Sequence, residues 1–137
     1  MTERTELLKS IRPQILSAKV HDNMTKDEQF QNATLRPIIK MQNDLFILVF
    51  KNYIRKRKNV FYGLSLPKQM QYIENAINKD MKFRNSLKGM IIGQFTLEEY
   101  EAYIQNSSAL NKRMMNIVKE RLVSNIQLFT LEMAEAI

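Results

Sequence analysis

The stretch that decides the fold class is LFILVFKNYIRKRK at residues 45–58, in which an apolar run is followed by a basic cluster. By itself, the run Leu45–Phe50 fits either a buried strand or the buried part of a helix. Its flanks favour a helix, because apolar positions repeat there at steps of three and four residues. This stripe comprises Phe30, Thr34, Ile38, Met41, Leu45, Leu48 and Asn52. Arg55–Lys58 would end the helix, where cations favour the negative dipole end, so we expect a central helix that is buried on most sides or shared with a second subunit.

The composition also favours helices. The chain has 137 residues but only three glycines and three prolines, whereas a β-rich domain of this length needs many turn residues. Its length predicts one domain, spanning 1–137, and 45% apolar residues suffice for a core. We therefore expect an all-α, compact single-domain bundle of five to seven helices with essentially no sheet.

Prolines and capping residues place the helix boundaries in the first half of the chain. The first helix is expected over about 3–20, with Pro13 kinking or restarting it. The second begins at Thr25, which forms a capping box with Glu28. Because Pro37 lies inside this second helix, we expect it to be long and bent near Pro37.

Further helices are expected in the second half of the chain. They span about 67–79, 81–92, a short stretch from 97, and 109–132, the last being a long C-terminal helix. Thr96 and Glu99 form a second capping box at the start of the short helix. Gly93 is expected to end the preceding helix in the left-handed conformation. Gly89 is expected to allow a close approach between two helices.

The positive charge is concentrated in the middle of the chain. The net charge is +7, and twelve basic residues face three acidic ones between Arg36 and Lys88. Such a distribution predicts one face for an anionic partner. A solvated surface that keeps the protein soluble would have the same composition, so both interpretations stay open.

The candidate site lies on this basic face, over residues 51–58 and 79–88. Cations contact phosphates, and exposed aromatic rings stack on bases. The candidate nucleic-acid or anion-binding residues are Lys51, Tyr53, Arg55, Lys56, Arg57, Lys58, Tyr62, Lys82 and Arg84. The first hypothesis is a binding module that docks RNA or a ribonucleoprotein, or else an acidic protein. The alternative is that the aromatic rings belong to the core and the cations to a helix end.

A second hypothesis is a homo-oligomeric structural or adaptor protein. In it, the apolar stretch 45–50 and the Met-rich C-terminal helix form the interface. Methionine suits adaptable helical surfaces, although it also fills ordinary cores.

Enzyme chemistry has little support in the residues. His21 is the one histidine and there is no cysteine, whereas a closed metal site needs three or four ligands. No glycine-rich phosphate-binding loop is present. We therefore name no catalytic residue, no metal ligand and no cofactor.

The sequence also predicts the compartment. The longest apolar run has six residues, whereas a membrane span needs about 20. Residues 2–6 are polar and no signal-peptide core follows them. The absence of cysteine fits a reducing compartment. We expect a soluble cytoplasmic protein with no membrane partner.

Three motifs carry a resemblance: FRNSLKG at 83–89, IGQFT at 92–96 and YIQNSSALNKR at 103–113. Over about residues 24–129, the chain resembles a group of short, uncharacterised, all-helical bacterial proteins that are often automatically labelled glyoxalase. The label implies a third hypothesis, a glyoxalase-like enzyme. The metal-dependent glyoxalase fold has βαβββ units with His and Glu ligands, and its partner hydrolase uses clustered histidines. With one histidine and no strand pattern, this chain has no matching catalytic residue.

Overall fold

The computed structural model describes residues 2–15 and 19–129, and the regular structure within these ranges is helical throughout. In chain order the elements are α1 (Glu3–Ile11), α2 (Lys26–Phe30), the π-helical segment η2 (Gln31–Leu35), α3 (Arg36–Met41), α4 (Asn43–Lys56), the 3-10 segment η3 (Val60–Gly63), α5 (Leu66–Lys79), α6 (Met81–Ile92), α7 (Leu97–Ile104) and α8 (Ser107–Ser124). The all-α class is confirmed, but the described residues form eight α-helices rather than five to seven.

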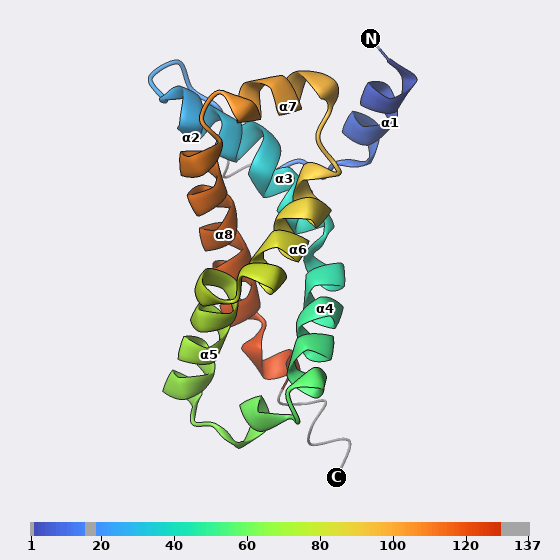
Figure 1. Cartoon of the computed structure of the whole chain (residues 1–137). Helices are drawn as coiled ribbons and strands as arrows, with labels where there is room; N and C mark the ends of the chain where they lie inside the picture. The colour runs from blue at the N-terminus through green and yellow to red at the C-terminus, as the bar shows by residue number, and fades with distance from the viewer. Residues whose placement is uncertain (1, 16–18, 130–137) are drawn as a thin grey trace.

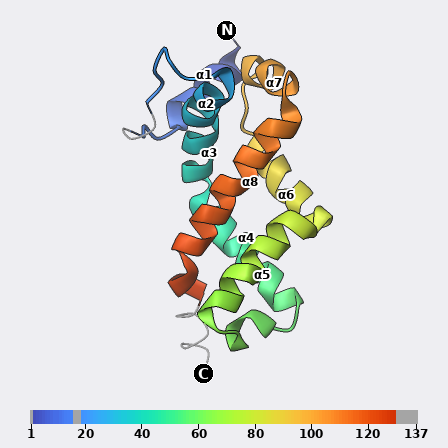
Figure 2. The ribbon, with the colours of Figure 1, turned by 90° about the vertical axis from the view of Figure 1, so that its left-hand side faces the viewer.

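The helices form an elongated bundle. Helices α8 and α4 run along its two sides and α6 crosses between them (Figure 1). Helices α2 and α7 lie at one end, and α5 with η3 lies at the other. Figure 2 shows that α8 runs along most of the length of the bundle. Within the described ranges, no helix is long and apolar enough to cross a membrane.

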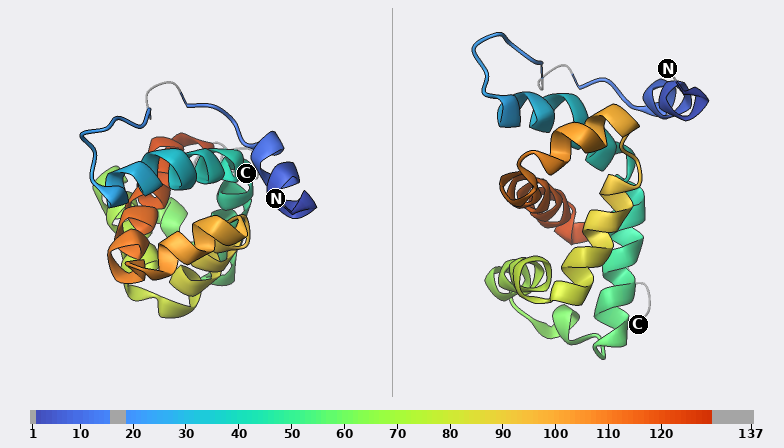
Figure 3. Two further views of the ribbon diagram at one scale, coloured as in Figure 1. Left: turned by 90° about the horizontal axis from the view of Figure 1, so that it is seen from above. Right: turned by 45° about the horizontal axis from the view of Figure 1, so that its top comes forward.

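Helix α1 is shorter than expected and lies beside the bundle (Figure 3). It ends at Ile11, and Arg12 is extended with φ −74° and ψ 133°. A residue before proline avoids the helical conformation, so Pro13 ends this helix instead of kinking it. The predicted continuation to residue 20 is wrong for 12–15 and 19–20, and residues 16–18 lie outside the described part.

A buried ion pair attaches the segment after α1 to the bundle. The Arg12 guanidinium contacts both carboxylate oxygens of Glu99, with Nη1–Oε2 at 2.6 Å and Nη2–Oε1 at 2.7 Å. Arg12 also donates to the Gln94 carbonyl at 2.7 Å, and the Thr34 hydroxyl donates to Glu99 at 2.8 Å. The side chains of Arg12 and Glu99 are only 8% and 14% exposed. Because a buried pair needs hydrogen bonds as well as opposite charges to be stable, these contacts fix the path of the chain across three elements.

The predicted second helix continues through Pro37 and breaks later. Helices α2, η2 and α3 follow one another without interruption from Lys26 to Met41. The break comes at Gln42, whose φ of −89° and ψ of 3° are not helical. Pro37 would normally clash with the carbonyl four residues earlier, but the wider π turn directly precedes it. The prediction of a bend near Pro37 is therefore wrong, because the helix breaks at Gln42 instead.

The π turn and the break shift the phase of the apolar stripe. On α4, Leu45 and Leu48 are 42% and 63% exposed, although both belong to the predicted stripe. The buried side chains of this stretch are instead Phe46, Ile47 and Phe50. A helical stripe read from sequence assumes an uninterrupted period of 3.6 residues, and two irregularities upstream break that assumption.

The core is centred on aromatic rings around Phe50, which is fully buried. Its ring centroid lies 5.1–6.3 Å from those of five other rings. These rings belong to Tyr53, Phe61, Tyr72, Phe83 and Phe129. They come from α4, η3, α5, α6 and the residues after α8, so one side chain joins five parts of the chain.

The second half of the chain follows its predicted boundaries closely. Helix α6 spans the expected residues, and the capping box of Thr96 and Glu99 is present. Helix α8 ends at Ser124; residues 126–129 are helical again, and 130–132 of the predicted helix lie outside the described residues.

Gly93 ends α6 as predicted, but its predicted left-handed conformation and the close approach predicted at Gly89 are wrong. Gly93 has a right-handed φ of −59°; an added Cβ would lie 3.1 Å from the Gly89 carbonyl oxygen, so the position is tight rather than left-handed. A Cβ added at Gly89 would meet nothing within 4 Å, so no helix of the described ranges packs closely against it.

Candidate functional site

The predicted basic cluster lies at the end of α4. Helix α4 ends at Lys56, and Lys58 and Asn59 then adopt left-handed φ values of 60° and 59°. The Asn59 N–H donates to the Ile54 carbonyl at 3.1 Å, which turns the chain away from the helix axis. Four exposed cations surround this turn: Arg55, Lys56, Arg57 and Lys58. The unpaired carbonyls of a helix end favour positive charge there.

A pocket of about 320 Å³ lies between this cluster and the start of α6. We call it the α4–α6 pocket. It brings together four of the nine predicted residues, Tyr53, Lys56, Arg57 and Lys82. Asn52, Asp80 and Ser86 add polar groups to its wall. Cations from two helices, distant in sequence, therefore share one concave surface.

Asp80 organises the floor of the α4–α6 pocket. As the N-cap of α6, its carboxylate accepts from the Phe83 N–H at 3.2 Å. It also accepts from the Tyr53 hydroxyl and from Arg57, each at 2.9 Å. The Phe83 N–H, the Tyr53 hydroxyl and the charge of Arg57 together lower the pKa of Asp80, despite the opposing effect of its partial burial. Asp80 thus stays ionised and fixes Arg57 in place.

Tyr53 offers no open face to a nucleic-acid base. Its residue is only 9% exposed, and the Arg57 guanidinium lies 3.5 Å from the centre of its ring. Tyr62 is half-buried, and its ring packs edge-on against Phe61 at 5.8 Å. The stacking contact expected from the sequence therefore has no exposed platform at Tyr53, whereas stacking on Tyr62 stays a prediction.

Five of the predicted residues lie outside the pocket lining. Arg55 donates to Asn52 Oδ1 at 2.8 Å, and Arg84 donates to the Ile77 carbonyl at the end of α5. Lys58 is exposed in the turn after α4, and the remaining two are Lys51 and Tyr62.

Sequence reasoning missed Asn52, Asp80 and Ser86. Asp80 had a readable signal, because an aspartate directly before an apolar helical stretch is a typical N-cap. Nothing local predicted that this N-cap would lie beside Tyr53, since the contact joins residues 27 positions apart.

A tyrosine titration tests this geometry. Burial and then the bond to Asp80 raise the pKa of Tyr53 to about 12, and burial also raises that of Tyr72. Because the pKa is higher in the folded state, the neutral tyrosine hydroxyl contributes its full stability below the unfolded pKa of about 10. This contribution is lost as the pH rises through the folded pKa. We expect the tyrosinate absorbance to show a late step, of which Tyr53→Phe removes one part while Tyr72 retains the other. All five tyrosines should ionise together in urea; a single early step in the folded protein would contradict the geometry.

The proposed oligomer interface is largely inside the protein. Met114 and Met115 are 0% and 1% exposed, so these methionines of α8 fill the core. Of the apolar stretch, Leu45 and Leu48 are the large exposed side chains. Met133 lies outside the described residues. A homo-oligomer stays a prediction that now depends on two leucines of α4.

No cluster of metal ligands is found in the described residues. His21 is exposed, and no group of three or more His, Cys, Asp or Glu side chains comes together in the described ranges. The one carboxylate that is strongly bonded and buried there, Glu99, has all its contacts satisfied by Arg12, Thr34 and Thr96.

The chain was compared with protein-family models, with curated proteins and with solved structures, and none of them matches it.

Proposed function

We propose that the protein is an RNA-binding module that holds the phosphate backbone at the α4–α6 pocket. The observation that carries the proposal is the convergence of Lys56, Arg57 and Lys82 on one concave surface. Phosphate contacts supply most of the affinity in sequence-independent binding. With the Tyr53 ring covered by Arg57, binding relies on charge and hydrogen bonds rather than on base stacking.

The two lysines are the groups that a phosphate would meet first. Lys56 and Lys82 are exposed, whereas Arg57 is already paired with Asp80 at 2.9 Å. Asn52 and Ser86 in the same wall provide neutral donors for phosphate or ribose oxygens. RNA is favoured over sequence-specific DNA. If α6 and α7 formed a DNA-binding helix-turn-helix, α7 would have to enter the major groove, where phosphates would repel its exposed Glu98 and Glu101.

The test is charge reversal inside and outside the pocket. We expect Lys56→Glu/Lys82→Glu to weaken binding of a short fluorescein-labelled RNA by about tenfold or more. The slope of log affinity against log salt concentration should also become shallower by about 1.4, because each phosphate contact on a single strand contributes about 0.7 to the slope and two contacts are lost. Fluorescence anisotropy at several salt concentrations measures both quantities.

The matched control is Lys9→Glu/Lys26→Glu, on α1 and α2 at the other end of the bundle (Figure 1). Both double variants lower the net charge of +7 by the same four units. Equal losses in the two variants would mean that net charge alone attracts RNA, and would overturn the assignment to this pocket. Equal affinity of the wild type for polyglutamate would likewise replace RNA with an acidic protein partner.

A further inference from the structure

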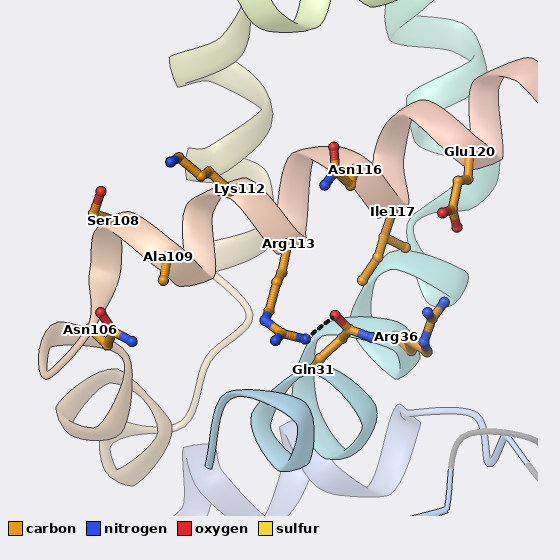
Figure 4. A pocket seen from close by; sticks show the side chains of 10 residues that line it. All are labelled: Gln31, Arg36, Asn106, Ser108, Ala109, Lys112, Arg113, Asn116, Ile117 and Glu120. Atoms are coloured by element: carbon orange, nitrogen blue, oxygen red, sulfur yellow. Dashed lines mark hydrogen bonds between the residues drawn. The ribbon is translucent and has the colours of Figure 1, made fainter. Parts of the chain in front are cut away.

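A second pocket, of about 650 Å³, lies between α8 and the helix that runs from α2 into α3. We call it the α3–α8 groove. Figure 4 shows Arg113 and Gln31 pointing toward one another from its two sides, with Arg36 beside Gln31 and Glu120 at one end. It shares no lining residue with the α4–α6 pocket. The two pockets can therefore be tested independently.

The π turn places two of these side chains on the same side of their helix. Gln31 and Arg36 are five residues apart, which in a regular α-helix would turn them by about 140° from one another. Here the Arg36 N–H bonds to the Gln31 carbonyl, the five-residue spacing of a π turn. Residues joined in this way lie nearly above one another. Both therefore face α8, and the irregular turn is what puts the Arg36 guanidinium into the groove.

The cations of the groove have few partners. Arg113 donates to Gln31 Oε1 at 2.9 Å. Among the ion pairs within the described residues, none involves Arg36, Lys112 or Arg113. Glu120 is the one acidic side chain in the lining. The groove thus carries three positive charges and one negative charge, a surplus of two.

This surplus matches one phosphate monoester, which carries close to two negative charges at neutral pH. Arginine suits it, because a guanidinium binds phosphate oxygens through two parallel hydrogen bonds. Glu120 would repel a second phosphate. The volume lies within the range of about 300–1,000 Å³ that is usual for small-molecule pockets.

The rest of the lining suits hydroxyl groups. Asn116 presents an amide and Ser108 a hydroxyl. Gln31 and Asn106 add amides that are partly engaged, since Gln31 Oε1 accepts from Arg113 and Asn106 Nδ2 donates to Asp27 at 2.8 Å. The Glu120 carboxylate would accept from a ligand hydroxyl. Ala109 and Ile117 are the apolar lining residues, and no aromatic ring lines the groove, so a nucleobase would have no stacking partner.

From these observations we propose that the α3–α8 groove binds a phosphorylated sugar or polyol. Arg36 and Arg113 hold the phosphate, and the amides with Glu120 hold the hydroxyls. The inference is independent of RNA binding, because it concerns different residues.

The experiment is calorimetric titration of the full chain with glucose 6-phosphate, ribose 5-phosphate and glycerol 3-phosphate. We expect at least one of them to bind more tightly than inorganic phosphate by about tenfold, since hydroxyl contacts add to the phosphate contacts. Glucose without phosphate should not bind measurably, and adenosine monophosphate, whose base finds no aromatic partner in the groove, should bind no better than ribose 5-phosphate. If no sugar or polyol phosphate exceeds inorganic phosphate, the proposal is overturned.

Variants assign the binding to the groove. Arg36→Gln should weaken it by about tenfold or more, the loss of one charge-assisted contact. Circular dichroism should stay unchanged, because within residues 2–15 and 19–129 no hydrogen bond or ion pair of the Arg36 side chain supports the fold. Lys40→Gln removes the same charge from an exposed position of α3 outside the groove and should have an effect within about twofold. Equal losses in the two variants would refute the site, as would a loss in Lys56→Glu/Lys82→Glu, which changes the other pocket.

Discussion

Replacing Phe50 with alanine is expected to lower the free energy of unfolding by about 4 kcal/mol. The side chain is fully buried and its ring meets five others. Alanine would leave a cavity that rigid neighbouring rings cannot fill, so the transfer and cavity costs add. A domain is stable by only about 5–15 kcal/mol, so urea denaturation should show a large shift of the midpoint.

Two further substitutions define the origin of this loss. Phe50→Leu keeps most of the buried apolar volume and is expected to cost about 1.5 kcal/mol. Leu48→Ala, on the same helix but at a position 63% exposed, is expected to cost less than about 0.5 kcal/mol. A loss at Phe50→Ala no larger than at Leu48→Ala would show that the aromatic core is not packed around Phe50.

The second large effect is expected at the buried ion pair. Glu99→Ala should cost about 3 kcal/mol, because it leaves the Arg12 guanidinium 8% exposed with no counter-charge. The Nε of Arg12 already lacks a hydrogen-bond partner among the described residues, so this atom makes no hydrogen bond that could compensate for the lost carboxylate. The same substitution also removes the capping bond to the Thr96 N–H (2.8 Å). Glu98→Ala is the control, since Glu98 is exposed on the same turn of α7. Equal losses of unfolding free energy in Glu98→Ala and Glu99→Ala would contradict a buried, bonded pair.

The same pair makes stability depend on pH. Burial raises the pKa of Glu99, but hydrogen bonds from Arg12, the Thr96 backbone and Thr34, together with the charge of Arg12, outweigh it and hold the pKa below its usual value. Because the pKa is lower in the folded state, the ionised carboxylate contributes its full stability above the unfolded pKa of about 4.3. This contribution is lost as the pH falls through the folded pKa. The wild type should therefore lose more stability on acidification than Glu99→Ala does.

Local signals predicted the elements well because capping is local chemistry. Thr25 and Thr96 were recognised as caps from residues within one helical turn, and each side chain accepts from the N–H three residues later. The phase of α4 was not predictable in this way. The break at Gln42 has no proline or glycine beside it, and the extra residue of the π turn leaves no mark in a pattern of apolar residues. The exposure of Leu45 and Leu48 follows from those two features.

The candidate site was predicted in part for a similar reason. A run of cations after an apolar helix is visible in the sequence, and four of the predicted residues do share a pocket. The burial of Tyr53 under Arg57, and its bond to Asp80, depend on how α4 meets α6. The α3–α8 groove depends on contacts such as Arg113 with Gln31, which are 82 positions apart, and only the tertiary structure brings them together.

The π turn also bears on how the chain tolerates changes of length. A π turn holds one residue more than an α turn, so the segment Gln31–Leu35 is equivalent to an α-helix that has gained a single amino acid. The widened turn accommodates that residue, and Gln31 and Arg36 on either side of it both face α8. Loss of exposed Ala33 would return the segment to regular helix with Gln31 and Arg36 four apart, still on one side. A one-codon insertion or deletion here is thus a step that evolution can take in either direction without rebuilding the bundle.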